Sequence, residues 1–218
     1  MTLKLNGSSS GSVSIDAPAS TTGGADVVLK LPVADGGTAN EILKTDASGQ
    51  LSFGGSITYK GTAVATTSGT SVEFTGIPAA ATRLTLLFAE VSASGTDNIK
   101  VQLGHSGAYY TSNYNSTGGW LGEGEGYSEI GLTDGFAVHN VYNGAGNSLI
   151  LRMTLTKLNN TDTGTSWIED HQGTQANVNV RFGGGILTSV STAVDRLKVI
   201  FTGSNTFDAG SMNLTWEL

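Results

Sequence analysis

The sequence contains no cysteine, which excludes disulfide bonds, thiol nucleophiles and cysteine-ligated metal sites. Charge is also scarce: 13% of the residues are charged, about half of the ~25% that is usual in soluble domains. The net charge is −7 and the 11 lysines and arginines are scattered, so no basic cluster is available for a phosphate backbone and we expect no nucleic-acid partner.

Long hydrophobic runs are missing as well. No apolar stretch approaches the ~18 residues of a membrane-spanning helix, so we expect no membrane insertion. The opening segment "MTLKLNGSSSGS" has neither a basic start nor an apolar run, and we expect no secretion signal. The sequence therefore predicts synthesis in a cytoplasm, with later release as a possibility left open.

Small polar residues take the place of the missing charges. The chain has 31 glycines among 218 residues, about twice the ~7% of an average protein, and is rich in Ser, Thr and Asn. A surface poor in charge suits a particle that is stable outside cells, or subunits that bury much of their surface in an assembly.

The hydrophobic pattern is that of an all-β protein, because short runs with a period of two alternate with Gly, Asn, Ser and Asp clusters. The best helical candidate, 39–44, is short enough to be a strand. Strands with one apolar and one polar face belong to antiparallel sheets. We therefore predict an antiparallel β-sandwich of jelly-roll type, from candidate strands at 72–74, 83–91, 99–103, 136–142, 149–158, 177–182, 196–202 and 212–218.

Three of these strands carry specific expectations. Residues 83–91 are apolar on both faces, which indicates a central strand or one covered by a neighbouring subunit. In 177–182 the apolar side chains at 178, 180 and 182 are expected to face the core, opposite Asn179 and Arg181. In the closing strand we expect the core to be lined by Met212, Leu214, Trp216 and Leu218.

Residues 1–53 form a separate stretch of three short strand–turn units, and the third is expected to be a hairpin, "EILKTD" turning into "QLSFG". They contain few large apolar side chains, and below ~70 residues a lone core is marginal. We therefore predict that 1–53 is a separate module wound together with identical copies of itself, that 54–59 is a linker, and that 60–218 is the sandwich.

The longest stretch that resembles a loop is 104–135. Aromatic faces beside Asn, Ser and Thr suit sugar recognition, because rings stack on the C–H faces of sugars while hydroxyl groups form hydrogen bonds. The alternative is that individual aromatic side chains pack under the loop or at a trimer interface. The receptor-binding candidates are Tyr109, Tyr110, Tyr114, Trp120 and Tyr127.

Other chemical sites are weakly indicated. Carboxylates in the same stretch could form a glycosidase pair or bind calcium, but no calcium-ligand ladder is present, and we favour the simpler interpretation that they are solvated loop charges; they are Glu123, Glu125, Glu129 and Asp134. His105, His139 and His171 are far apart in sequence. The segment "SWIEDHQG" is interpreted as a polar turn after Trp167. We expect no enzyme activity, no metal and no cofactor.

Two segments resemble a known family. "LKLNGSSSGSVSIDAP" with "NEILKTDASGQLSFG" is similar to the amino-terminal module of tail-fibre and fibre-like virion proteins of tailed phages, particularly phages of cyanobacteria. "FTGSNTFDAGSMNLTWEL" resembles the closing segment of a β-sandwich domain in the same class. The resemblance implies a homotrimeric virion appendage with an amino-terminal attachment segment and a globular tip that contacts the host.

The function expected from sequence is that of a phage virion structural protein, a short tail fibre whose sandwich binds a host-surface receptor. The partners would be two identical copies, other virion proteins of the tail or capsid, and a host glycan or protein. The alternatives are a capsid fibre or decoration protein with a purely structural role, and a polysaccharide depolymerase spike. The expected location is the surface of the virion, after assembly in the host cytoplasm.

Overall fold

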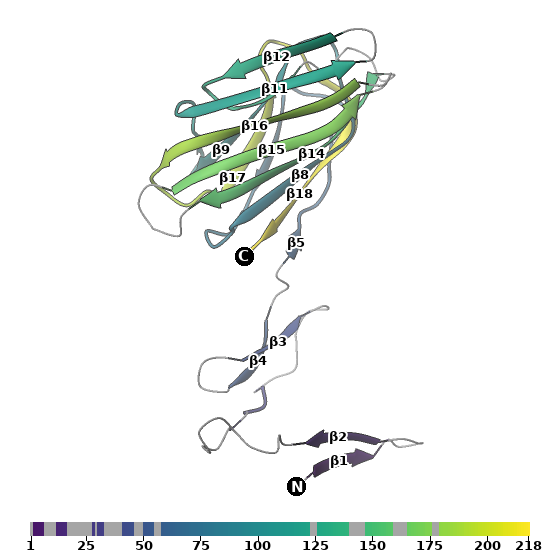
Figure 1. The fold of residues 1–218 in the computed structure, drawn as a ribbon, viewed down its shortest axis with the longest axis vertical. Helices are drawn as coiled ribbons and strands as arrows, with labels where there is room; N and C mark the ends of the chain where they lie inside the picture. Colours follow the sequence, from purple (N-terminus) through teal and green to yellow (C-terminus); the bar gives the residue numbers. More distant parts are fainter. Residues whose placement is uncertain are drawn as a thin grey trace. The chain divides into compact units, whose positions relative to one another are not determined.

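The computed structural model describes residues 2–6, 12–16, 28, 30–32, 41–45, 50–54, 58–122, 126–139, 147–158, 165–175 and 179–218. The chain divides into two compact units, Met1–Ser56 and Ile57–Leu218. The described residues of both units form antiparallel strands and no α-helix (Figure 1). The prediction of an all-β chain with antiparallel sheets is therefore confirmed.

The described residues of the first unit form two hairpins. Strand β1 (Thr2–Asn6) pairs with β2 (Ser12–Asp16), and β3 (Ile42–Thr45) pairs with β4 (Leu51–Gly54). The β3–β4 hairpin is the one predicted from "EILKTD" and "QLSFG". Five large apolar side chains described here are 41% to 79% exposed, whereas Leu51 is half-buried; the five are Val28, Leu31, Ile42, Leu43 and Phe53.

The second unit contains two antiparallel sheets. The large sheet runs β12 (Gly126–Leu132), β11 (Tyr114–Gly122), β16 (Asn179–Val190), β15 (Thr165–Gln175), β14 (Leu149–Leu158), β8 (Arg83–Ala93), β18 (Phe207–Glu217) and β5 (Thr58–Lys60), and β6 (Val64–Ala65) also pairs with β18. The small sheet runs β10 (Ala108–Tyr109), β9 (Ile99–His105), β17 (Arg196–Phe201) and β7 (Ser71–Thr75), and β13 (Phe136–Val138) also pairs with β9.

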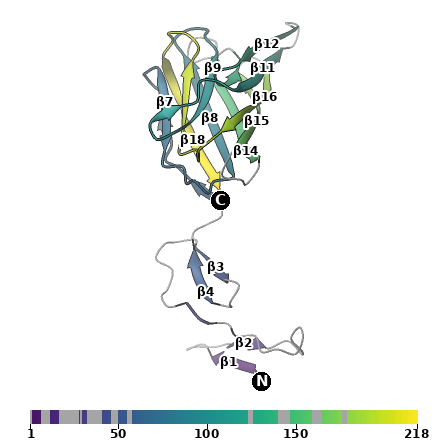
Figure 2. The same cartoon turned by 90° about the vertical axis from the view of Figure 1, so that its left-hand side faces the viewer.

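The hydrophobic core joins apolar side chains of both sheets into one cluster. Figure 2, turned by 90° from Figure 1, places β7 on one side of the unit and β14, β15 and β16 on the other. In β9, β14 and β17 the alternation of apolar and polar residues predicts which face points inward, and the apolar side chains of that face are at most 5% exposed: Ile99, Val101, Leu103, Leu149, Leu151, Met153, Leu155, Leu197, Val199 and Phe201.

Strand β8 is central, as its pattern predicts, because it pairs with β14 on one side and β18 on the other. Leu84 and Leu86 are fully buried, and Phe88 is 2% exposed. Leu87 points to the opposite face and is 40% exposed. One face of this strand therefore lies in the core, while the other carries a leucine on the outside of the sandwich.

Only some of the side chains of the closing strand β18 that were predicted to line the core are buried. Met212 and Leu214 are buried, whereas Trp216 is half-buried and stacks on Tyr59 with a ring-centroid separation of 6.2 Å. The prediction for Leu218 was wrong, since this residue is 46% exposed. Pairing of β18 with its neighbours ends at Glu217, so no strand extends beside Leu218 to cover it.

The interpretation of 104–135 as one long loop was also wrong, since most of it forms β10, β11 and β12. Glycine suggested a loop, but in β11 it serves close packing instead. A Cβ atom at Gly118 would lie 2.5 Å from the carbonyl oxygen of Ala137, which is closer than atoms can approach. Here glycine permits the strand of one sheet to approach the backbone of the other.

Replacement of a buried residue of β18 tests this description. Leu214→Ala leaves a cavity in the core, and we expect it to lower the free energy of unfolding by about 2–5 kcal/mol. Leu218 belongs to the same alternating pattern but is exposed. Leu218→Ala should therefore change the free energy of unfolding by no more than about 0.5 kcal/mol. Denaturant unfolding of the full chain, followed by tryptophan fluorescence, measures both; equal losses in the two variants would contradict the assigned burial.

Candidate functional site

The side chains of strand β16 point to the opposite faces from those predicted. Arg181 is fully buried, whereas Val180 and Phe182 are 42% and 38% exposed on the outer face of the large sheet. The sequence pattern assigned the apolar side chains to the interior because burial of a charge is costly unless partners stabilise it. The neighbouring strands supply such partners.

Arg181 lies in a polar cluster between the sheets. Its guanidinium carbon lies 5.6 Å from the ring centroid of Trp120, a cation–π contact, and its Nη2 donates a hydrogen bond to the Oε1 of Gln175. Trp120, 8% exposed, also meets the ring of His139 edge-on at 6.5 Å. The His139 Nε2 is 3.1 Å from the Oγ of Ser128. Trp120, a predicted receptor contact, therefore packs in the interior.

The same interior holds an acid–base pair on β15. Glu169 and His171 are two positions apart on the strand and share the inner face, with 2.7 Å between Oε1 and Nδ1. They are 2% and 3% exposed. The prediction of a polar turn after Trp167 was wrong, because polar side chains point inward in this strand. Burial raises the pKa of Glu169, and the hydrogen bond from His171 partly opposes that shift.

This buried cluster is closed to large ligands. Within the described part of the chain, no three His, Asp or Glu side chains are arranged so that they could hold a metal ion. Of the carboxylates predicted as candidates, Asp134 accepts a hydrogen bond from Lys100, and Glu129 accepts one from Tyr127. Glu123 and Glu125 lie outside the described residues.

Tyr114 is part of the core. It is 4% exposed, its hydroxyl oxygen accepts a hydrogen bond from the Leu103 amide at 2.9 Å, and its ring meets Phe136 edge-on at 5.0 Å. These contacts join β11 of the large sheet to β9 and β13 of the small sheet. Burial removes Tyr114, like Trp120, from the surface that a receptor could touch in this structure.

Tyr109 and Tyr110 lie together at the end of the small sheet. The Nζ of Lys198 is 4.1 Å from the centre of the Tyr109 ring, and the Tyr110 hydroxyl lies 2.7 Å from the Oγ1 of Thr192. Partial burial first, and then the Glu73 carboxylate, raise the pKa of Tyr109 to about 12. Both tyrosines are half-buried, so part of each side chain packs against the protein and part is accessible to solvent.

Charged and polar groups next to these tyrosines are fixed by hydrogen bonds. The Arg196 Nε donates to Asp195 at 2.7 Å, and the Ser106 amide donates to the same carboxylate at 2.9 Å. The bond from Arg196, followed by that from Ser106, holds the pKa of Asp195 below its usual value. His105 contacts the Ala193 carbonyl oxygen through Nδ1 at 2.8 Å. This end of the sandwich combines aromatic rings with an ordered set of charges.

Tyr127 lies elsewhere, on the outer face of the large sheet. It is 55% exposed and stacks on Phe182, with 6.1 Å between ring centroids and 17° between planes. Its hydroxyl donates to Glu129. The structure therefore groups Tyr109 with Tyr110, buries two of the predicted aromatics, and separates Tyr127 from them.

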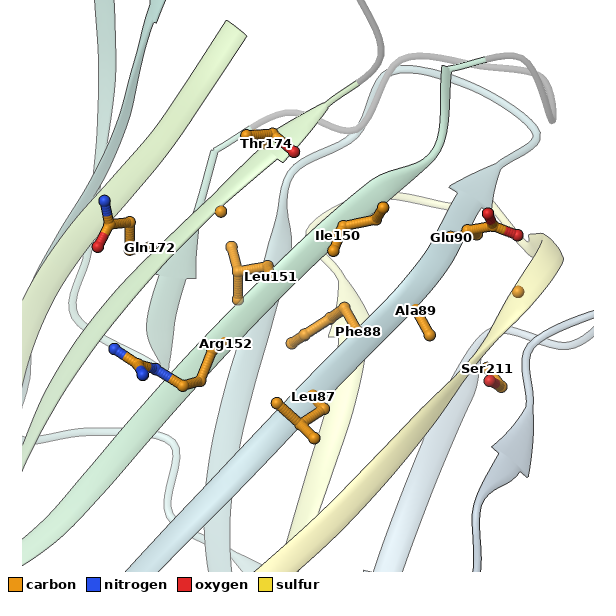
Figure 3. A pocket seen from close by; sticks show the side chains of 12 residues that line it. Leu87, Phe88, Ala89, Glu90, Ile150, Leu151, Arg152, Gln172, Thr174 and Ser211 are labelled. Atoms are coloured by element: carbon orange, nitrogen blue, oxygen red, sulfur yellow. The ribbon is translucent and has the colours of Figure 1, made fainter.

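The same outer face contains an open depression of about 780 Å³. It lies over β8, β14, β15 and β18, where Leu87, Ile150 and Arg152 project from neighbouring strands (Figure 3). Glu90 and Gly210 both have positive φ there, at 56° and 90°. The register of β8 with its partners shifts at this point, which interrupts the regular sheet surface. Its residues come from four separate stretches of the chain, so no local sequence pattern indicates the depression.

No family model, no curated protein and no solved structure matches the chain. Among the described residues, no helix is long and apolar enough to cross a membrane.

The buried cluster predicts a pH-dependent stability. Burial, and then the nearby Arg181, lower the pKa of His139 to about 4. The unfolded histidine titrates near 6.5, so between these values the unfolded chain binds a proton that the folded chain does not, and stability falls as the pH falls. His139→Gln keeps a hydrogen-bonding side chain but cannot titrate.

We expect the parent protein to lose up to about 2 kcal/mol more than His139→Gln when denaturant unfolding is repeated at about pH 7 and about pH 4.5. Protonation of Glu169 acts in the opposite direction, because its folded pKa is raised, but it is common to both proteins and cancels in the difference. Identical losses in the two proteins would contradict the role of His139.

Proposed function

We propose that the chain is a subunit of a short, fibre-like virion appendage whose sandwich binds a host-surface glycan. In this proposal the first unit joins identical copies into a homotrimer and attaches them to other virion proteins. A jelly-roll topology for the sandwich and a trimeric prism for residues 1–53 belong to the same proposal. It describes a binding protein at the virion surface, not an enzyme, with no cofactor.

The observation that carries the proposal is the contrast between the two units. In the first unit five of the described large apolar side chains are exposed, with Leu31 the most exposed at 79%, and Leu51 is half-buried. The second unit has a complete core. Two hairpins of this size bury too little apolar surface to offset the entropy of ordering the chain, so association with copies of itself would supply the missing burial.

The tyrosine-bearing end of the small sheet is the preferred receptor surface. The side chains of Tyr109 and Tyr110 are half-buried and held in place, the first by Lys198 over its ring and the second by Thr192 at its hydroxyl. Rings that are already fixed lose little conformational freedom on binding. The charged and polar groups beside them can donate and accept hydrogen bonds from sugar hydroxyls. A purely structural capsid fibre, the alternative, would have no use for this surface.

Self-association through the first unit can be tested at the β3–β4 hairpin. Leu43 and Phe53 lie directly opposite each other and are 55% and 43% exposed. We expect the double variant Leu43→Ser/Phe53→Ser to shift the mass in light scattering toward the 22.3 kDa of one chain, because each buried apolar side chain contributes about 1.5–3 kcal/mol.

Lys44→Ser is the matched control for that variant, since it changes an exposed polar residue of the same strand. It should leave the mass of the assembly unchanged. If the double variant assembles as well as the parent protein, the hairpin is not where copies of the chain meet.

Receptor binding can be tested at Tyr109. We expect Tyr109→Ala to weaken binding to an array of bacterial surface polysaccharides by about tenfold or more, because loss of an aromatic contact typically costs more than about 1 kcal/mol. Thr75→Ala, an exposed change on β7 of the same sheet, should bind as the parent does. Unchanged binding by a folded Tyr109→Ala protein would place the receptor surface elsewhere.

A further inference from the structure

We propose that the outer face of the large sheet is an interface between copies of this chain, in which the depression of one sandwich receives the Tyr127–Phe182 stack of the next. This inference rests on the proposed self-association and adds to it a second contact surface, in Ile57–Leu218. The occupant is a second copy of the chain rather than a glycan or an unrelated protein.

Large apolar side chains are concentrated on this face. Seven of them, from β8, β11, β12, β14, β15 and β16, are 38% to 55% exposed: Leu87, Leu121, Tyr127, Ile150, Ile168, Val180 and Phe182. The strand register places Ile150, Thr174, Val180, Leu121 and Tyr127 in one row across the sheet. Most of the seven are aliphatic, which suits a protein surface better than a sugar, and contiguous exposed patches of this kind mark contact sites.

The two halves of the face are complementary in shape and charge. One half, on β8 and β14, contains the depression and Arg152, for which no ion pair is found among the described residues. The other half, on β16, β11 and β12, presents the stacked rings of Tyr127 and Phe182 beside the carboxylate of Glu129. A head-to-tail contact would bring Arg152 of one copy to Glu129 of the next, and such contacts close into rings when the rotation permits.

The outer face of the small sheet, on the opposite side of the sandwich, is polar rather than apolar. The outer face of the small sheet carries exposed Ser71, Glu73 and Thr75, with Lys198 and Arg196 on the next strand. None of the large exposed apolar side chains found among the described residues lies on this sheet. The sandwich therefore has one outer face suited to water and one suited to a subunit, which also agrees with the outward Val180 and Phe182 and the inward Arg181.

Engineered disulfides test the contact directly, because the natural chain has no cysteine. In Ile150→Cys/Leu121→Cys the two cysteines lie three strands apart, at about 4.8 Å per strand, which is too far for a bond within one chain. We expect the full-length double variant to form intermolecular disulfides under mild oxidation and to appear as covalent oligomers in non-reducing electrophoresis. Each single variant should remain uncrosslinked, because the proposed contact pairs unlike halves.

The control is Ser71→Cys/Ala108→Cys, a pair of exposed positions on the small sheet, which should stay monomeric in the same gel. Light scattering before oxidation separates the two proposals. An assembly that forms without crosslinking through Ile150 and Leu121 would overturn the interface while leaving self-association intact. A monomeric parent protein would overturn both.

A charge exchange provides a second, independent measurement. We expect Arg152→Glu and Glu129→Arg each to reduce crosslinking of the Ile150→Cys/Leu121→Cys protein, and the combination of both changes to restore it. Failure of the combination to restore crosslinking would contradict the pairing of these two residues. If Tyr127→Ala weakens glycan binding while the crosslinks fail to form, the face is a receptor surface and the inference is wrong.

Discussion

Apolar side chains from two antiparallel sheets, among them Leu214 of β18 and Leu197 of β17, fill one interior between the sheets. Each such side chain contributes about 1.5–3 kcal/mol when it leaves water, so this packing fixes which face of every strand points inward. The other face of each strand is then left for other purposes. The function proposed for residues 57–218 depends on how these two outer faces differ.

The interior is not uniformly apolar. Arg181 and the Glu169–His171 pair occupy the part of it near β15 and β16, where removal of one partner would leave a buried charge at a cost of several kcal/mol. Trp120 and Gln175 stabilise the arginine by direct contact. Because these polar groups point inward, Val180 and Phe182 on the same strand must point outward. The direction in which the side chains of β16 point therefore explains both the buried polar cluster and the apolar outer face.

Much of the fold could be predicted from sequence, but less of the candidate site. Strands such as β9 and β14 alternate apolar with polar residues, and alternation alone gave their buried faces. The same rule failed for β16, since it cannot recognise that Trp120 and Gln175 would stabilise an inward arginine from other strands. Glycines suggested a loop at 104–135, although Gly118 is needed where two sheets approach closely. Aromatic enrichment identified five candidates without separating buried Tyr114 from exposed Tyr127, because that difference is set by pairing partners distant in sequence.

We propose that the chain works as an assembly of identical copies, in which exposed apolar side chains of the first unit and of the large sheet are the surfaces that meet. The mass of the unmodified full-length protein in solution, measured by light scattering over a range of concentrations, tests this claim most directly. We predict a stable trimer with three times the 22.3 kDa mass of one chain. A mass of 22.3 kDa at every concentration would contradict it.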